Sequence, residues 1–117
     1  MTGADWTTGI AAILYEHCAA CGTVSYFRRG FCPVCGGADV RDETSAGLGR
    51  VHAVTLVTRA PTPELRALAP YAILLVDMDE GFRMMAHGDP GLALDEPVAA
   101  TFCDFGGRLV PHFGRRP

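Results

Sequence analysis

The chain of 117 residues contains no lysine, and its ten basic side chains are all arginines. Basic pairs occur at Arg28-Arg29 and Arg115-Arg116, and the formal net charge is −3. Because phosphate neutralisation supplies much of the affinity for nucleic acids, this charge distribution disfavours general DNA or RNA binding.

The sequence also lacks a long apolar run, and no segment approaches the roughly twenty apolar residues of a membrane span. Its first residues, Met-Thr-Gly-Ala-Asp-Trp, show no basic region followed by an apolar stretch, as a secretory signal would. We therefore expect a soluble, cytoplasmic protein. With 49% hydrophobic and 20% charged residues, the composition is that of a globular chain with a core to bury.

Four of the five cysteines form two Cys-x2-Cys pairs: Cys18 and Cys21, then Cys32 and Cys35. In each pair two thiolates can wrap one side of a metal ion, and the glycine after the second cysteine permits the tight turn. Two such knuckles predict a tetrahedral cage of four sulfurs. Since protein sulfur fills all four positions, we expect a structural Zn²⁺ rather than a catalytic metal.

Two disulfides are an alternative interpretation of these cysteines, but they require an oxidising compartment, which nothing in the sequence indicates. A mononuclear iron site is the second alternative, because iron uses similar knuckles and would make the protein an electron carrier.

His17 adjoins Cys18. With four cysteines available, we expect His17 to be a surface neighbour and not a ligand. Four bound thiolates and one divalent ion would change the net charge of −3 by −2, to −5.

The sequence predicts a mainly β protein: an N-terminal zinc ribbon, residues 1–45, followed by a five-stranded OB-fold barrel, residues 46–117. The segment 11–16 favours a short strand that leads into the first knuckle, with an amphipathic helix from Trp6 as the alternative. The polar, glycine-containing stretch 36–49 is typical of a connector. One helical turn is expected at 64–68. The predicted barrel strands are 49–59, 71–79, 82–87, 98–104 and 108–113.

Three aromatic residues, Tyr26, Phe27 and Phe31, lie between the knuckles. We expect them to pack around the metal site, because such rings are usually buried. An exposed aromatic recognition face is the alternative.

The order of these parts resembles the family of acyl-CoA-associated OB-fold proteins with a rubredoxin-like zinc ribbon. The resemblance is carried by the four cysteines, by Gly49-Arg50 with Thr55 at the barrel opening, and by Pro70-Tyr71-Ala72 before the central strand. Asp79-Glu80-Gly81 at a hairpin and a final Pro-x-Phe complete it. Members of the family are often small companions of thiolase-like or acyl-CoA-processing enzymes. The resemblance implies a non-catalytic accessory subunit that binds acyl-CoA and docks on such an enzyme.

No residue of the chain is expected to be catalytic. Cys103 lies within a predicted strand without a glycine-rich turn to expose it, so we expect a core position. The histidines at 52, 87 and 112 also fall on predicted strands, where structural or surface roles are usual. Asp77, Asp79 and Glu80 are too few for an oxygen cage, and a solvated acidic turn is expected.

A CoA ester requires arginines near its phosphates and an apolar groove for its pantetheine arm. The positions beside the ribbon and the long barrel loop make Arg28, Arg29, Arg59 and Arg66 the candidates, with solvated surface arginines as the alternative. A single-stranded nucleic-acid module is the alternative function, because zinc ribbons and OB barrels both serve it and use aromatic platforms.

Overall fold

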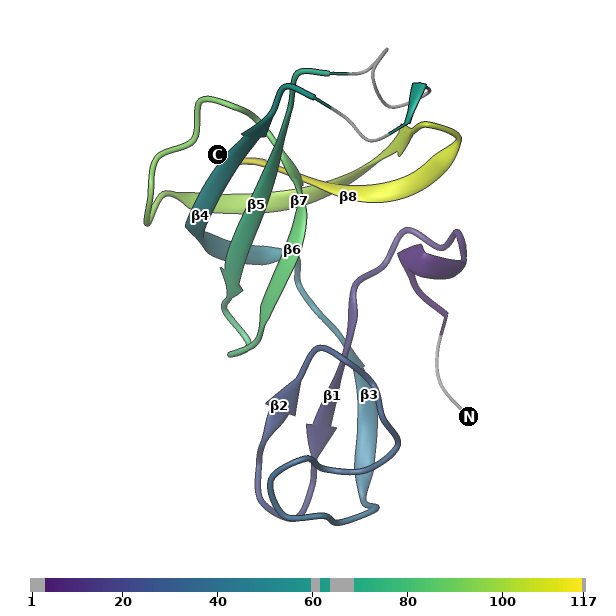
Figure 1. Ribbon diagram of the computed structural model, residues 1–117. Coiled ribbons are helices and arrows are strands. Elements are labelled where there is room, and N and C mark those ends of the chain that lie inside the picture. Colours follow the sequence, from purple (N-terminus) through teal and green to yellow (C-terminus); the bar gives the residue numbers. More distant parts are fainter. Residues whose placement is uncertain (1–3, 60–61, 64–68, 117) are drawn as a thin grey trace.

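The structure is a computed structural model that describes residues 4–59, 62–63 and 69–116. Figure 1 shows two β units, a small sheet below and a barrel above, joined by the chain between β3 and β4. The small sheet has the order β2-β1-β3 and is antiparallel throughout. Its strands are β1 (Leu14–Cys18), β2 (Val24–Ser25) and β3 (Val40–Thr44).

The larger unit is a closed barrel with the strand order β4-β5-β6-β8-β7. Its strands pair antiparallel except for β6 with β8, which are parallel. A five-stranded barrel with this order is an OB fold, which confirms the predicted fold class. The strands are β4 (Leu48–Val57), β5 (Tyr71–Met78), β6 (Arg83–Gly88), β7 (Pro97–Phe105) and β8 (Arg108–Arg115). The helical turn predicted at 64–68 lies outside the described residues.

The first barrel strand, β4, closes the barrel by pairing with two neighbours. Its beginning pairs with β7 and almost its whole length with β5, where the register shifts between Val51 and Ala53. A bulge of this kind bends and twists a strand, which lets one strand reach both partners. Gly49 of β4 lies close against β5, and a Cβ placed there would stand 2.6 Å from the Asp77 carbonyl oxygen.

The prediction that residues 36–49 form only a connector is wrong. Residues 40–44 form β3, which pairs with all five residues of β1. The strand is polar, and ion pairs to neighbouring elements hold two of its side chains. His17 in β1 pairs with Glu43 at 2.7 Å, and Arg28 pairs with Asp42 at 2.9 Å.

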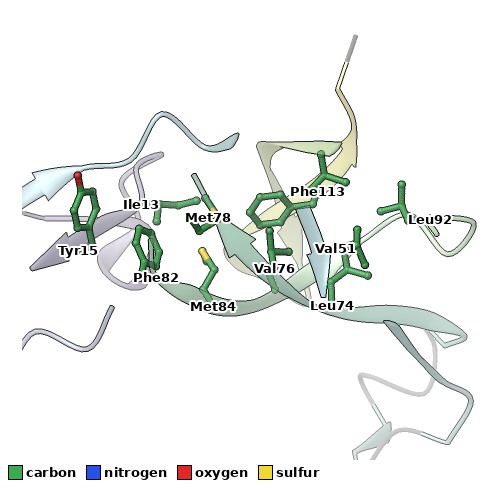
Figure 2. Close-up of a cluster of buried hydrophobic side chains, with 12 residues drawn as sticks. Ile13, Tyr15, Val51, Leu74, Val76, Met78, Phe82, Met84, Leu92 and Phe113 are labelled. Carbon is green, nitrogen blue, oxygen red and sulfur yellow. The ribbon is translucent and has the colours of Figure 1, made fainter. Parts of the chain in front are cut away.

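The core runs without interruption from the ribbon into the barrel. Figure 2 shows Tyr15 and Ile13 of the ribbon side next to Phe82 and Met78, followed by Val76 and Phe113 deeper in the barrel. Phe82, on the β5–β6 hairpin, is 5% exposed and stacks on Tyr15 with ring centroids 4.9 Å apart. Burial of shared apolar surface therefore joins the two units.

The β5–β6 hairpin also makes a polar contact with the ribbon. Glu80 accepts hydrogen bonds from the Ser45 hydroxyl and from the Ala46 amide, both at 2.8 Å. Asp79 lies 3.5 Å from Arg116, and Asp77 pairs with Arg83 at 2.6 Å. The side chains of Asp77 and Asp79 are 49% and 52% exposed, as expected for a solvated acidic turn, although each of the three carboxylates also has a protein partner.

Ahead of β1, the chain forms a single 3-10 turn, η1 (Trp6–Thr8), and not the longer helix considered as an alternative. Asp5 caps it by accepting from the Thr7 amide, and Gly9 ends it in the left-handed conformation with φ of 91°. The turn lies beside the barrel near the β7–β8 hairpin (Figure 1). Trp6 thereby comes close to residues of both units.

Candidate metal centre and ligand cleft

The two Cys-x2-Cys pairs come together at one end of the ribbon. The four sulfur atoms of Cys18, Cys21, Cys32 and Cys35 all lie within 4.8 Å of one another. The Sγ atoms of Cys18 and Cys35 are 3.7 Å apart, and those of Cys21 and Cys32 are 3.5 Å apart. Four sulfurs bound tetrahedrally to Zn²⁺ at about 2.3 Å would be about 3.8 Å apart, so the cluster fits this ion.

Backbone amides donate hydrogen bonds to two sulfurs of the cluster. The amides of Val34 and Cys35 donate to Cys32 Sγ at 3.4 and 3.5 Å, and the Gly37 amide donates to Cys35 Sγ at 3.4 Å. Donation from the Cys35 amide is the main reason why the pKa of Cys32 is lowered to about 6. In the first knuckle, a hydrogen bond from Thr23 lowers the pKa of Cys21. The Gly37 amide acts to lower the pKa of Cys35, but hydrogen bonds with the sulfurs of Cys18, Cys32 and Cys21 raise it to about 11. The donors therefore favour the thiolate at Cys32 and Cys21 and not at Cys35.

His17 lies beside the cluster in sequence but points to a different partner. Its Nδ1 is 2.7 Å from Glu43, and its side chain is partly exposed. This agrees with its expected place as a surface neighbour.

The aromatic residues between the knuckles do not pack around the sulfur cluster as predicted. Phe27 is 69% exposed and Phe31 is 48% exposed. Tyr26 turns toward the barrel, where its ring stacks on Phe82 with centroids 5.6 Å apart and planes 7° apart. The small ribbon has no second layer to cover these rings, and the barrel covers one of them.

A cleft of about 700 Å³ lies between the N-terminal turn, the ribbon and the barrel. Its barrel side is formed by the outer face of β5 and β6, where Leu75 pairs with Met85. These are the second and third strands of the barrel, the face on which OB folds commonly bind ligands. The residues around the cleft are mostly apolar or aromatic: Asp5, Trp6, Thr7, Tyr26, Phe27, Arg28, Leu75, Arg83, Met84 and Met85.

Both arginines of the cleft are matched by carboxylates. Arg28 pairs with Asp42 at 2.9 Å and with the buried Asp5 at 3.4 Å. Arg83 pairs with Asp77 at 2.6 Å, and the hydrogen bond lowers the pKa of that carboxyl. The cleft therefore has charged residues at its edge but no excess of positive charge.

The three predicted CoA-binding arginines within the described part of the chain, Arg28, Arg29 and Arg59, do not all lie at the cleft. Arg28 lines the cleft, whereas Arg29 donates to the Ser25 hydroxyl at 3.1 Å and lies over the Phe27 ring. Arg59 is an exposed residue just after β4. Arg66 lies outside the described residues.

The other candidate side chains have structural partners. His52 and Arg83 both contact Asp77, and His112 Nε2 lies 2.8 Å from Asp89. The His87 ring lies 4.1 Å from Phe105 between centroids, and burial is the main cause of its lowered pKa. Cys103 is only partly buried in β7 and is not the core residue expected.

Sequence reasoning missed most of the cleft, because its residues come from distant parts of the chain. Trp6, Tyr26 and Met85 meet only after the ribbon has docked on the barrel. The single tryptophan and the adjacent Met84-Met85 pair were the available signals, and neither specifies a partner.

The fold and the sulfur cluster together define a protein with a rubredoxin-like ribbon followed by an OB barrel. Two family descriptions match it: "ChsH2, rubredoxin-like zinc ribbon domain" over residues 12–41 and "ChsH2, C-terminal OB-fold domain" over residues 42–103. The chain belongs to the ChsH2 family.

Similar proteins carry two kinds of description. A "DUF35 domain-containing scaffold protein" of Methanothermobacter thermautotrophicus is 34% identical over 73 residues, covering 62% of this chain and 54% of the relative. A "Probable enoyl-CoA hydratase alpha subunit" of Thermomonospora curvata is 31% identical over 75 residues, covering 64% of this chain and 23% of the relative. The chain thus spans about half the length of the first relative and a quarter of the second.

Among solved structures, the chain resembles one described as "Ltp2-ChsH2(DUF35) aldolase", with a TM-score of 0.73 and 25% identity. The superposition covers 87% of this chain and 83% of that chain, so it includes both the ribbon and the barrel. Separately, no helix in the described part of the chain has the length and hydrophobicity of a membrane span.

Proposed function

We propose that the chain is a non-catalytic accessory subunit that binds acyl-CoA and docks on a thiolase-like or other acyl-CoA-processing enzyme. One observation carries this proposal: the ribbon and the barrel together resemble a solved structure described as "Ltp2-ChsH2(DUF35) aldolase". That description names two components, Ltp2 and ChsH2, in one aldolase. Relatives described as scaffold proteins support the accessory role, and one described as an enoyl-CoA hydratase subunit supports the acyl-CoA context.

We further propose that Cys18, Cys21, Cys32 and Cys35 bind one structural Zn²⁺. The spacing of their sulfurs and the surrounding amide donors support this assignment. Four sulfur ligands leave no coordination position for water or substrate, so the ion would order the ribbon and not perform chemistry. Elemental analysis should find about one zinc per chain in a colourless protein. A red protein that absorbs visible light would mean iron instead.

The tip of the second knuckle is our candidate for contact with the partner enzyme. Phe31 and Val34 flank Cys32 and are 48% and 74% exposed. A metal-bound loop would hold these apolar side chains in place, which reduces the entropy lost on docking. Val34→Asp should weaken the complex, whereas Leu94→Asp, at an equally exposed apolar residue after β6, should not.

The single-stranded nucleic-acid function receives less support from the structure. The β5–β6 face is apolar in the cleft, and the arginines there are already paired with carboxylates. Phosphate binding would have to break these ion pairs and overcome a net charge of −3.

Co-expression with a candidate thiolase-like protein, followed by size-exclusion chromatography, tests the proposal. We expect a stoichiometric complex, with binding of a CoA ester measurable by calorimetry. Neither a complex nor CoA-ester binding at near-millimolar ligand would contradict the proposal. Salt-dependent binding of an oligonucleotide would favour the alternative.

A further inference from the structure

The cleft beside Trp6 has the size and lining of a small-molecule site. Its volume of about 700 Å³ lies within the range of about 300–1,000 Å³ typical of ligand pockets. Phe27 from the ribbon and Met85 from the barrel both line it, and they are 69% and 64% exposed. Two large apolar side chains left exposed around one cleft indicate that a further apolar group covers them.

The charges around the cleft exclude a strongly anionic occupant. Arg28 is held by Asp42 and Asp5, and Arg83 by Asp77, so their positive charges are compensated before any ligand arrives. A phosphate placed there would compete with buried or partly buried carboxylates. The lining is complementary to the neutral part of a ligand.

One polar group distinguishes the cleft from a plain apolar surface. The Tyr26 hydroxyl accepts a hydrogen bond from the Trp6 indole N–H at 3.1 Å. That bond uses a lone pair of the oxygen, so the hydroxyl keeps its own proton, for which the described residues provide no acceptor. Burial raises the pKa of Tyr26, so the proton stays on the oxygen at neutral pH. The site therefore offers a hydrogen-bond donor to a carbonyl oxygen.

We propose that this cleft binds the acyl group of a thioester, with its chain against Phe27, Leu75 and Met85 and its carbonyl oxygen near the Tyr26 hydroxyl. The inference rests on the proposed acyl-CoA function and adds a site and a ligand class. The predicted arginines were assigned to the phosphates of CoA, so this site adds a separate binding region for the acyl group. The phosphates of a CoA ester lie outside this cleft.

Fluorescence of Trp6, the single tryptophan, reports directly on occupancy of the cleft. Titration with S-decanoyl-N-acetylcysteamine, a neutral thioester, should change the emission. Acyl chains from acetyl to decanoyl should bind about tenfold more tightly for each two added methylenes that become buried. Free CoA should compete poorly, because it lacks the acyl group.

Variants locate the binding site. Met85→Arg should weaken decanoyl binding at least tenfold, whereas Leu94→Arg, outside the cleft, should leave it unchanged. Tyr26→Phe, which removes the donor, should weaken thioester binding about fivefold. Arg108→Ala controls for a second cleft of about 470 Å³ on the other side of Trp6 and should have no effect on the neutral thioester.

Three results would overturn the inference: no emission change with the neutral thioester, no dependence on acyl length, or equal effects of Met85→Arg and Leu94→Arg. Displacement of the thioester by an oligothymidylate, or self-association that Met85→Arg abolishes, would assign the cleft to another occupant and also overturn it. If free CoA and the partner enzyme still bind in these cases, the proposed function stands without this site. If the thioester binds but neither the partner enzyme nor CoA does, the cleft is still an acyl-binding site and the proposed accessory function fails.

Discussion

Phe82 of the barrel hairpin stacks on two tyrosine rings of the ribbon, on Tyr26 with centroids 5.6 Å apart and 7° between the planes, and on Tyr15 with centroids 4.9 Å apart. Stacked aromatic pairs contribute beyond the apolar area that they bury. Since Phe82 is 5% exposed, these stacked rings form a largely buried contact between the two units. The state of the ribbon is thereby coupled to the barrel and to the cleft beside Trp6.

Replacing Phe82 should weaken this contact. We expect Phe82→Ala to lower the free energy of unfolding by about 3 kcal/mol, from lost burial and a residual cavity. The single transition in denaturant should then broaden or separate into ribbon and barrel steps. Leu94→Ala, at a residue 67% exposed, should change stability by less than about 0.5 kcal/mol. Equal stability of the two variants would show that the units are not coupled through Phe82.

Removing the metal should disorder the ribbon and disturb the cleft. Cys32→Ser, or a chelator added to the native protein, should abolish zinc retention as measured by elemental analysis. Because Tyr26 is positioned by the ribbon and bonds to Trp6, the tryptophan emission should shift toward that of a solvated indole. Cys103→Ser lies outside the sulfur cluster and should keep both zinc and emission unchanged. Native emission from the metal-free protein would argue against a structural metal.

Gly49 should not tolerate a side chain. A Cβ at this position would stand 2.6 Å from the Asp77 carbonyl oxygen and 2.8 Å from Val76, so β4 and β5 would have to separate. We expect Gly49→Ala to destabilise the protein by about 2 kcal/mol in a denaturant titration. Gly91→Ala meets nothing within 4 Å and serves as the control. If Gly49→Ala lowers the free energy of unfolding no more than Gly91→Ala does, β4 and β5 accommodate the added side chain without a large cost.

His87 should make stability depend on pH. Burial first, and then the nearby His112, lowers its pKa in the folded state below the ordinary histidine value of 6.5. The unfolded state therefore binds a proton first as pH falls, so stability is complete above about pH 6.5 and decreases below it, down to the folded-state pKa. His87→Gln should reduce this slope, provided that zinc content is unchanged. An NMR titration that places the pKa of His87 at or above 6.5 would contradict the prediction.

The cysteine spacing and the apolar strands were enough to predict the sulfur cluster and the barrel. β5, for example, is apolar in all of its eight residues except Asp77, and its strand character needs no tertiary information. β3 was missed because its sequence, Val-Arg-Asp-Glu-Thr, has the composition of a connector and becomes a strand by pairing with β1. The exposed Phe27 and the cleft were missed for a related reason, since both depend on how the ribbon sits on the barrel.

Turnover of a CoA ester by the chain alone, by the proposed thiolase-like partner alone and by the two together tests the central claim most directly. We predict no turnover by the chain alone, and a partner whose activity or solubility rises when the zinc-loaded chain is added in stoichiometric amount. Turnover by the isolated chain, or a partner equally soluble and active without it, would contradict the account of an accessory subunit.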